Sequence, residues 1–195
     1  MLIHILSHIV EFRNGESGSH VIHIHKLTEM LLERLAQKTE KYHLDGDTRV
    51  MIALASSLHD IGKIGIPESI LKKKGKLTDE EYEVMKTHVE NSIEMIHFLP
   101  NMNYVIPAVL SHHERYDGKG YPDGLKGDDI PISAQVVALA DVYDALTSER
   151  CYKKAFDHDT AIQMILDGQC GQFNPILLKC LKEPVSYTHL TLPTT

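Results

Sequence analysis

VMIALASSLHDIGKIG, residues 50–65, is an apolar segment that ends in a histidine, an aspartate and two glycines. Its apolar residues recur at steps of three and four, the spacing that places side chains on one face of an α-helix. These residues are Val50, Leu54, Leu58 and Ile61. Gly62 and Gly65 allow the backbone to leave the helix without steric penalty. The segment therefore predicts a buried helix with His59 and Asp60 at its carboxyl end.

The same spacing recurs along the chain, and no segment shows the sustained two-residue alternation of a half-buried strand. A capping box, Thr78 with Glu81, opens a helix that we expect to run to Ile96. Ser133–Thr147 predicts a later helix capped by its serine. The intervening segment 115–131 is rich in glycine and proline, which predicts a long ordered loop. We therefore expect an all-α bundle of about six to eight helices.

The length and composition fit one globular domain. The 195 residues are 43% hydrophobic and 24% charged, the balance of a single folded unit rather than of a repeat or a disordered chain. We expect residues 1–184 to form this domain, with a metal-binding core over about 16–175. The composition shifts at Val185 to serine, tyrosine, threonine and proline, so residues 185–195 are predicted to be a non-native or disordered tail.

Charge, cysteine content and hydropathy exclude several classes of protein. With 20 basic and 27 acidic residues the formal charge is -7, which argues against duplex nucleic acid because that partner requires a basic face. Three cysteines without a C-x-x-C spacing encode neither a disulfide framework nor a thiolate zinc site. No stretch approaches the roughly 18 apolar residues of a membrane span, and the apolar start lacks a basic leader. We therefore expect a cytoplasmic protein without a membrane partner, in which nitrogen and oxygen atoms hold any metal.

Histidine is the unusual residue of this composition, with 13 copies against no tryptophan. The histidines and acids of interest are Glu16, His20, His59, Asp60, His88, His112, His113 and Asp141. Each has a plain structural interpretation when taken alone, such as a helix-stabilising pair, a solvated helix end, a hydrogen-bonded core histidine or a surface pair. Asp141 fits such an interpretation least, because a carboxylate inside the apolar run 136–142 is costly to bury unless it is paired or coordinated.

Taken together, five histidines and three carboxylates from four or five expected helices favour a metal centre. Eight ligands exceed the needs of one ion, and bridging carboxylates would let them hold two or three divalent ions, the arrangement used for in-line displacement at phosphorus. The mixture of imidazole and carboxylate favours iron, manganese or zinc over magnesium or calcium, which prefer oxygen ligands. Three such ions would leave a positive centre that attracts a phosphodiester despite the acidic chain.

The same residues lie in longer strings that resemble a known family. The strings are Glu16-x-x-x-His20, His59-Asp60-Ile61-Gly62-Lys63, His88, His112-His113-Glu114-Arg115-Tyr116-Asp117-Gly118-Lys119-Gly120-Tyr121-Pro122 and Ala140-Asp141-Val142-Tyr143-Asp144-Ala145-Leu146-Thr147-Ser148. They resemble the HD-GYP family of the HD phosphohydrolase superfamily, from about Glu16 to Pro175. The resemblance implies an HD-domain helical bundle that hydrolyses the second messenger cyclic di-GMP to linear pGpG, with onward cleavage to GMP left open.

The resemblance also implies roles for the histidines and acids. All eight occupy the metal-ligand positions of the family, with Asp60 bridging two ions. Members that keep the early glutamate are associated with three ions and those without it with two, so Glu16 favours three in this chain. Iron or manganese is expected first, with zinc as the alternative. A hydroxide held between metals would attack phosphorus, and the ribose 3' oxygen would leave on the opposite side.

Other motif positions imply catalytic and substrate-binding roles. Lys63 would steady a phosphate or the bridging hydroxide, although an exposed loop lysine would look the same in the sequence. Tyr121 lies in the glycine-rich loop that would shape the pocket wall. Asp144 would contact either the substrate or a ligand histidine. Arg150 and Lys153 stand where the family binds guanine and phosphate, which suits a planar guanidinium, or else they form a solvated charge cluster.

Departures from the family pattern leave alternatives open. Gln135 and His23 stand where many relatives carry arginine, and Asn174 replaces a common aspartate; none of the three is an inferred ligand. A catalytically weak cyclic-dinucleotide sensor or partner-binding module with the same fold is a second hypothesis. An HD hydrolase of another nucleotide, including mixed cyclic dinucleotides, is a third. An upstream receiver or sensor domain, or another signalling protein, is the expected partner.

Overall fold

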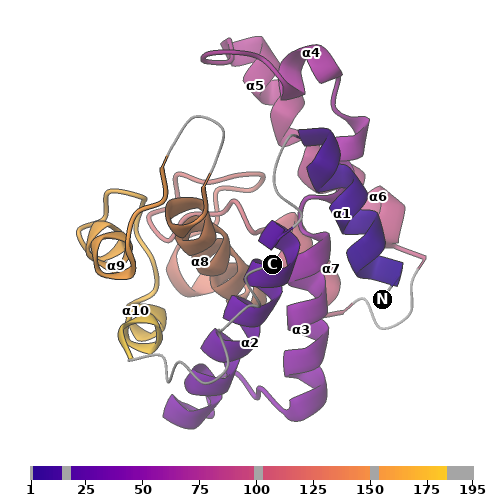
Figure 1. Cartoon of the computed structure of the whole chain (residues 1–195). Coiled ribbons are helices and arrows are strands. Elements are labelled where there is room, and N and C mark those ends of the chain that lie inside the picture. Colours follow the sequence, from indigo (N-terminus) through magenta and orange to yellow (C-terminus); the bar gives the residue numbers. More distant parts are fainter. Residues whose placement is uncertain (1, 15–18, 99–102, 150–153, 184–195) are drawn as a thin grey trace.

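The computed structural model describes most of the chain, namely residues 2–14, 19–98, 103–149 and 154–183. Within these ranges every regular element is a helix, which confirms the expected all-α fold (Figure 1). Glu16, Arg150, Lys153 and the tail 185–195 lie outside the described residues, so the roles expected of them stay predictions. In the described parts, no helix combines the length and apolar character that crossing a bilayer requires.

The described elements are α1 (Leu2–Asn14), α2 (Ser19–Lys38), α3 (Gly46–Leu58), η1 (Ile61–Gly65), α4 (Glu68–Leu71), α5 (Asp79–Lys86), α6 (His88–Ile96), α7 (Val105–Leu110), η2 (Gly127–Asp129), α8 (Ile132–Thr147), α9 (His158–Leu166) and α10 (Pro175–Lys182), where η marks a 3-10 helix. The α-helices outnumber the expected six to eight because the region between α3 and α8 is divided into short ones. The single helix expected to run from Thr78 to Ile96 is two, α5 and α6. They separate at Thr87, whose hydroxyl and backbone N–H both donate to the carbonyl of Val84 and so tighten the last turn of α5.

Side-chain caps fix where several helices begin. Asp45 accepts a backbone N–H of the first turn of α3, and the predicted capping box of Thr78 and Glu81 is present at α5. The predicted serine cap of α8 is wrong. Pro131 occupies the cap position, so Ser133 falls inside the first turn of the helix. Proline at this point has a fixed φ that suits an extended residue entering a helix.

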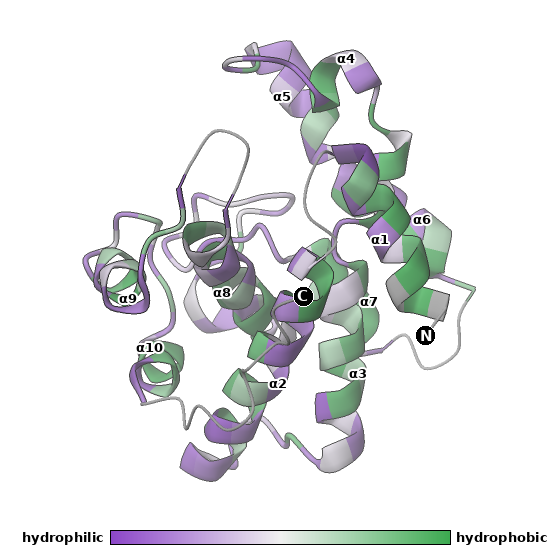
Figure 2. Cartoon of the chain, viewed as in Figure 1, coloured by the Kyte–Doolittle hydropathy of each residue, from purple (hydrophilic) through white to green (hydrophobic). Residues whose placement is uncertain are grey.

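Two apolar clusters hold the bundle together. The larger joins α2, α8, α9 and α10 with one residue of α3, and the smaller joins α3, α6 and α7 with one residue of α8. In Figure 1, α2 lies between α3 and α8, and it contacts both. Figure 2 shows hydrophobic residues along α3 and α7 and polar residues along α5. Burial of the apolar faces therefore brings α2, α3, α7 and α8 together near the carboxyl end of α3.

The segment from Ser111 to Pro131 contains only the short helix η2, which confirms the expected long loop. Gly118 in this loop has a φ of 79°, a conformation that favours glycine. Gly120 allows a close approach of two backbones, because a Cβ added there would lie 2.4 Å from the carbonyl oxygen of His113. The loop is thus folded back against the histidine pair that precedes it.

Candidate metal centre

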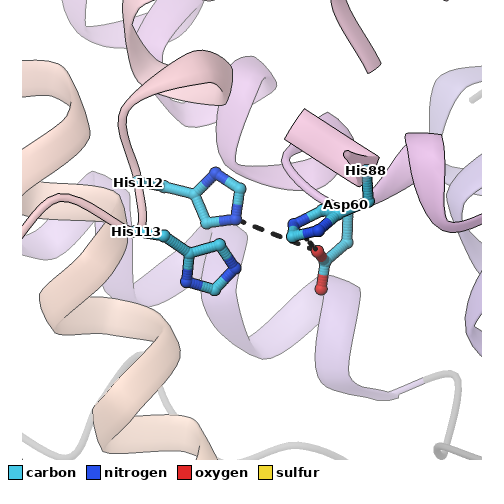
Figure 3. A group of neighbouring side chains, drawn as sticks. All are labelled: Asp60, His88, His112 and His113. Atoms are coloured by element: carbon cyan, nitrogen blue, oxygen red, sulfur yellow. Dashed lines mark ion pairs between the residues drawn. The ribbon is translucent and has the colours of Figure 1, made fainter. Parts of the chain in front are cut away.

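A first group of possible ligands lies where α3 ends. Asp60, just beyond α3, faces His88 at the start of α6 and His112 and His113 after α7 (Figure 3). One ligand atom from each of the four lies within 4.8 Å of the others. The Asp60 Oδ1 atom is 3.2 Å from His88 Nε2 and 3.8 Å from His112 Nε2. Imidazoles from two other parts of the chain therefore converge on one carboxylate.

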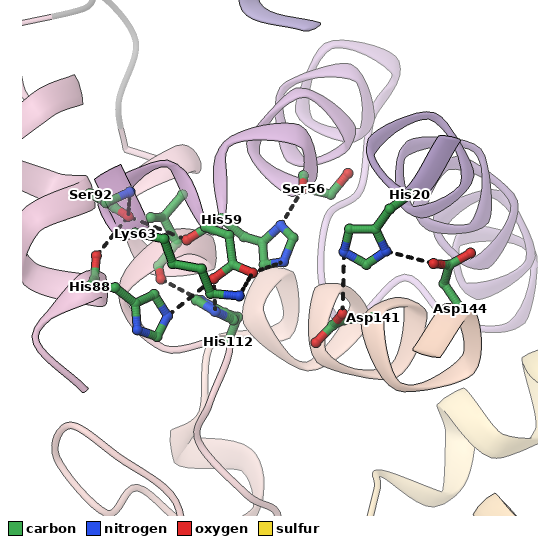
Figure 4. A network of polar contacts seen from close by, with 12 residues as sticks. His20, Ser56, His59, Lys63, His88, Ser92, His112, Asp141 and Asp144 are labelled. Atoms are coloured by element: carbon green, nitrogen blue, oxygen red, sulfur yellow. Dashed lines mark hydrogen bonds and ion pairs between the residues drawn. The ribbon is translucent and has the colours of Figure 1, made fainter. Parts of the chain in front are cut away.

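A second group adjoins the first. It consists of His20 on α2, His59 at the end of α3 and Asp141 on α8, again with one ligand atom of each within 4.8 Å of the others. His20 Nε2 is 3.7 Å from Asp141 Oδ1 (Figure 4). His59 Nε2 is 3.2 Å from Asp60 Oδ2, the oxygen opposite the one that faces His88. Asp60 thus presents one oxygen to each group.

Hydrogen bonds at Nδ1 orient four of the histidine rings. His59, His88 and His112 each place Nδ1 within 2.6 to 2.8 Å of the backbone carbonyl three residues earlier. His20 Nδ1 is 2.6 Å from Asp144 Oδ2. These acceptors assign the proton to Nδ1, so the lone pair of each neutral ring is on Nε2 and directed at the acids. Metal-binding histidines are held in this way.

Several inward atoms of the two groups lack hydrogen bonds. The Nε2 atoms of His59, His88 and His112 and the Oδ1 atom of Asp60 are buried without a hydrogen-bond partner. Buried polar atoms are nearly always paired, and leaving several unpaired beside one another is costly. Divalent cations would satisfy all of them, and nitrogen with carboxylate oxygen is a donor set for iron, manganese or zinc. The residues present therefore fit a metal centre.

Burial and neighbouring charges set the protonation of the first group. Burial lowers the pKa of His113 to about 3. Burial and then the neighbouring His113 lower the pKa of His112 well below its ordinary value, so both rings are neutral at pH 7. Burial alone would raise the pKa of Asp60, but Lys63 and His59 outweigh it and hold that pKa well below the usual range. The carboxylate at the centre is therefore charged.

In the second group, neighbouring acids outweigh burial and raise the pKa of two histidines. Burial opposes protonation of His59, but the charge of Asp60 prevails and raises its pKa to about 9. Burial likewise opposes protonation of His20, whereas its hydrogen bond to Asp144 and the charge of Asp141 raise its pKa. The acids of this region thus favour a positive charge at both rings, which a bound cation would supply in place of a proton.

Lys63 lies on η1, directly after the His59-Asp60 pair. Its Nζ atom donates to Asp60 Oδ2 at 2.5 Å. Arg13 reaches over from α1 and donates to three backbone carbonyls of this turn, those of Lys63 at 3.1 Å, Ile64 at 2.6 Å and Ile66 at 2.9 Å. The guanidinium therefore fixes the turn that carries the lysine.

Gly62 brings this turn against α6. Its backbone N–H donates to Ser92 Oγ at 2.8 Å. A Cβ at Gly62 would lie 2.0 Å from the carbonyl oxygen of His88 and 2.4 Å from the backbone nitrogen of Ser92. Glycine is thus needed for Asp60 and His88 to approach each other.

A cavity of about 430 Å³ opens beside the ligands. His112, His113 and Asp141 line it on the side of the metal centre, and the loop between α9 and α10 lines it elsewhere. The rings of His113 and Tyr121 stack at a centroid distance of 4.7 Å and an angle of 26°. Burial raises the pKa of Tyr121, so its phenol stays protonated and can donate a hydrogen bond. The volume is in the range of small-molecule sites.

Most of the sequence candidates meet at this place. The structure brings together His20, His59, Asp60, His88, His112, His113 and Asp141, and Glu16 lies outside the described residues. Lys63 contacts Asp60, and Tyr121 lines the cavity. Of the two partners expected for Asp144, the structure shows the histidine: His20 and His23 both contact its carboxylate.

The sequence analysis missed two residues of α1. Glu11 is only 2% exposed, and its charge contributes to raising the pKa of both His20 and His59. Arg13 holds the turn after Asp60, as described above. The spacing of the buried residues Ser7, Val10 and Glu11 is the signal that could have found the acid, since it marks an inward helix face that extends toward the site.

An all-α bundle that buries histidines and aspartates in this manner is typical of metal-dependent hydrolases. The chain belongs to the HD domain family, whose model matches residues 6–175. It is 40% identical over 91% of its length to a probable cyclic di-GMP phosphodiesterase of Vibrio cholerae, of which it covers 42%. It is 39% identical over 93% of its length to a 3'3'-cGAMP-specific phosphodiesterase of the same organism, of which it covers 34%. These matches confirm the resemblance inferred from the motifs.

The chain spans less than half the length of these curated relatives. Among solved structures, it resembles a cyclic GMP-AMP specific phosphodiesterase (V-cGAP3) of V. cholerae with a TM-score of 0.64 at 17% identity, covering 93% of this chain and 48% of the other. At that identity the likeness supports the fold alone, and it agrees with the all-α architecture described above.

Proposed function

We propose that this chain is a metal-dependent phosphodiesterase that hydrolyses cyclic di-GMP to linear pGpG. The observation that carries the proposal is the pair of ligand groups joined at Asp60, whose two oxygens each lie 3.2 Å from a histidine Nε2 of a different group. Adjacent groups sharing a carboxylate are the arrangement of enzymes that displace an oxygen at phosphorus. The relatives named as cyclic di-GMP phosphodiesterases support the substrate.

Two metal ions have ligands among the described residues. One would be held by Asp60, His88, His112 and His113, and the other by His20, His59 and Asp141, with Asp60 between them. Iron or manganese is proposed first and zinc as the alternative. Such ions lower the pKa of a bound water and neutralise the nonbridging oxygens of the phosphate. Glu16 is proposed as a ligand of a third ion.

Other side chains are proposed to orient the metal ligands and to bind the substrate. Lys63 places an ammonium group on Asp60 Oδ2, where it can also attract a phosphate oxygen. Tyr121 offers a phenol proton to the substrate from the cavity wall. Asp144 holds His20 with Nε2 directed at Asp141. Arg150 and Lys153 are proposed to bind guanine and phosphate.

A second candidate substrate is 3'3'-cGAMP, because a relative that is 39% identical over 93% of this chain is named as specific for it. The ligand groups act on the phosphodiester, which both cyclic dinucleotides share, so they do not discriminate between the bases. Side chains of the cavity wall would make that choice.

We also propose that residues 1–184 act as one domain, because α1 and α10 both pack against α2 within the bundle. Where this domain belongs to a longer protein, as in the curated relatives, a receiver or sensor domain is the proposed partner. The residues 185–195 are proposed to contribute nothing to the site.

The test is to purify the protein without oxygen, measure bound metal, and follow cyclic di-GMP and 3'3'-cGAMP by chromatography. We expect metal-loaded protein to release pGpG. Asp60→Ala should abolish hydrolysis and metal retention while keeping the helical circular dichroism spectrum. His97→Ala is the matched control, since His97 makes the same bond from Nδ1 to the carbonyl three residues earlier but is exposed.

Three outcomes would contradict parts of this proposal. Near-normal turnover in Asp60→Ala would reject the shared carboxylate. Metal-loaded protein that binds cyclic di-GMP but leaves it intact would favour a sensor. Equal cleavage of unrelated phosphodiesters would favour a hydrolase of broader range.

A further inference from the structure

One side of the cavity carries an arginine to which neither the motif comparison nor the metal centre gives a role. Arg115 follows the His112-His113-Glu114 run and lines the cavity together with Gly171 and Phe173 of the loop between α9 and α10. Its Nε atom is 3.7 Å from Asp117 Oδ1, at the long end of an ion pair.

The loop between α9 and α10 lies close to this guanidinium. A Cβ added at Gly171 would lie 2.3 Å from Arg115 Nη2, 2.7 Å from its Cζ and 3.2 Å from its Nη1. The guanidinium is thus laid against the bare Cα of Gly171, whose φ of 105° itself favours glycine. An arginine whose side chain is 44% exposed is ordinarily free to sample many rotamers. Here it lies beside Gly171, and both residues line the cavity.

The position of Arg115 relative to the ligands suggests what it binds. It is two residues beyond His113, and it shares the cavity with His113 and Asp141, so a group bound by Arg115 would belong to the molecule whose phosphodiester is at the metal centre. The planar fork of a guanidinium matches two adjacent acceptors, either two oxygens of a phosphate or the O6 and N7 atoms of guanine. A cyclic dinucleotide presents both kinds of group outside the phosphodiester that is cleaved.

We propose that Arg115, which lies against Gly171, is a specificity-determining residue that binds a two-acceptor group of the cyclic dinucleotide away from the scissile bond. The proposal rests on the proposed function and adds a subsite to it. Because Arg115 lines the same cavity as His113 and Asp141, a substrate in this cavity would be bound at the metals and at Arg115 together.

The experiment compares cyclic di-GMP, cyclic di-AMP and bis(p-nitrophenyl) phosphate, a diester with neither base nor second phosphate. Arg115→Ala is expected to raise the KM for cyclic di-GMP by about 10- to 100-fold, the usual range for a lost hydrogen-bonded charge. The KM for bis(p-nitrophenyl) phosphate should rise much less. Arg115→Lys should recover only part of the loss, because an ammonium lacks the fork. A loss confined to cyclic di-GMP identifies guanine as the bound group, and an equal loss with cyclic di-AMP identifies the second phosphate.

Replacement of Gly171 tests the same subsite, and a second glycine of the same loop provides a control. Gly171→Ala should raise the KM for cyclic di-GMP as Arg115→Ala does, because the new methyl group displaces the guanidinium. Gly168→Ala is the control: Gly168 lies in the same loop with a φ of 71°, but its added Cβ would meet no atom closer than 3.9 Å. Any effect common to both variants is backbone strain, and circular dichroism reports whether each is folded.

Failure of this inference can be told from failure of the proposed function. A wild-type protein that cleaves cyclic di-GMP, with an unchanged KM in Arg115→Ala, overturns the role of Arg115 alone. A wild-type protein that cleaves bis(p-nitrophenyl) phosphate but no cyclic dinucleotide overturns the proposed function. In that case the dissociation constant of cyclic di-GMP is compared between wild type and Arg115→Ala by calorimetry, and an equal or undetectable affinity overturns this inference as well.

Discussion

Replacement of Asp144 by asparagine tests whether a hydrogen bond behind the metal centre controls metal affinity. The Asp144 carboxylate lies 2.6 Å from His20 Nδ1, 3.0 Å from His23 Nδ1 and 2.8 Å from Ser148 Oγ. Burial alone would raise the pKa of Asp144, but the hydrogen bonds from His20 and His23 hold it below its usual range. The group is therefore an anion that accepts from three donors.

An asparagine amide keeps the size of this side chain but offers one oxygen acceptor and one donor group. At most one of the two histidine Nδ1–H groups then keeps a good acceptor, and the charge is gone. A lost hydrogen bond to a charged partner is worth about 1.5–3 kcal/mol, which is roughly 10- to 100-fold in an equilibrium constant. Loss of a partner behind a metal ligand has the same measured range, about 10- to 100-fold in metal affinity.

The assay is the dissociation constant of Mn²⁺, measured by competition with a fluorescent chelator, together with the metal content of the purified protein. We expect Asp144→Asn to bind one Mn²⁺ about 10- to 100-fold more weakly, whereas the ion held by Asp60 and its partners keeps its affinity. Ser148→Ala is the control, because it removes a bond to the same carboxylate but no bond to a ligand. Equal Mn²⁺ affinities and metal contents for wild type and Asp144→Asn would refute the argument.

Three further predictions concern the surroundings of the centre. Arg13→Ala should lower kcat by about 10- to 100-fold, because the turn that carries Lys63 loses its three carbonyl contacts; an unchanged kcat with normal metal content would count against it. Gly62→Ala should destabilise the protein by about 1–3 kcal/mol, since its Cβ would lie 2.0 Å from the carbonyl oxygen of His88; urea unfolding compares it with Gly46→Ala, whose Cβ would meet nothing within 4 Å. Removal of metal by a chelator should lower stability by about 4 kcal/mol where free metal had been a thousand times its Kd, or about 8–16 °C in Tm at about 2–4 °C per kcal/mol; equal melting curves before and after chelation would contradict this.

Periodicity predicted the all-α fold, and the motifs predicted which residues would lie together at the candidate site. The architecture followed from apolar spacing, and the candidate ligands followed from the strings around His59, His88, His112 and Asp141. The motifs identify residues that act together because their chemistry requires a fixed residue type at each position. They could not supply distances, since convergence of α2, α3, α6 and α8 depends on how their apolar faces pack.

Two residues that sequence reasoning missed are Arg13, which contacts the turn after Asp60, and Gly171, which lies against Arg115. Arg13 and Gly171 have no distinctive chemistry in the sequence, because one is an ordinary arginine and the other one of 12 glycines. Their contacts join residues 50 positions apart, Arg13 to Lys63, and 56 positions apart, Gly171 to Arg115. Local patterns carry no information on such pairs, so only the folded chain shows them.

The adjacent His59 and Asp60 pose a geometric problem that the end of α3 solves. Neighbours on a regular helix point about 100° apart, so one ion seldom binds both. α3 ends at Leu58, His59 still has helical backbone angles, and Asp60 departs from them with φ of -106° and ψ of 8°. His59 can therefore join the group that contains His20, while Asp60 turns toward His88. Because the two side chains belong to different groups of possible ligands, their divergence is what places one carboxylate between the two groups.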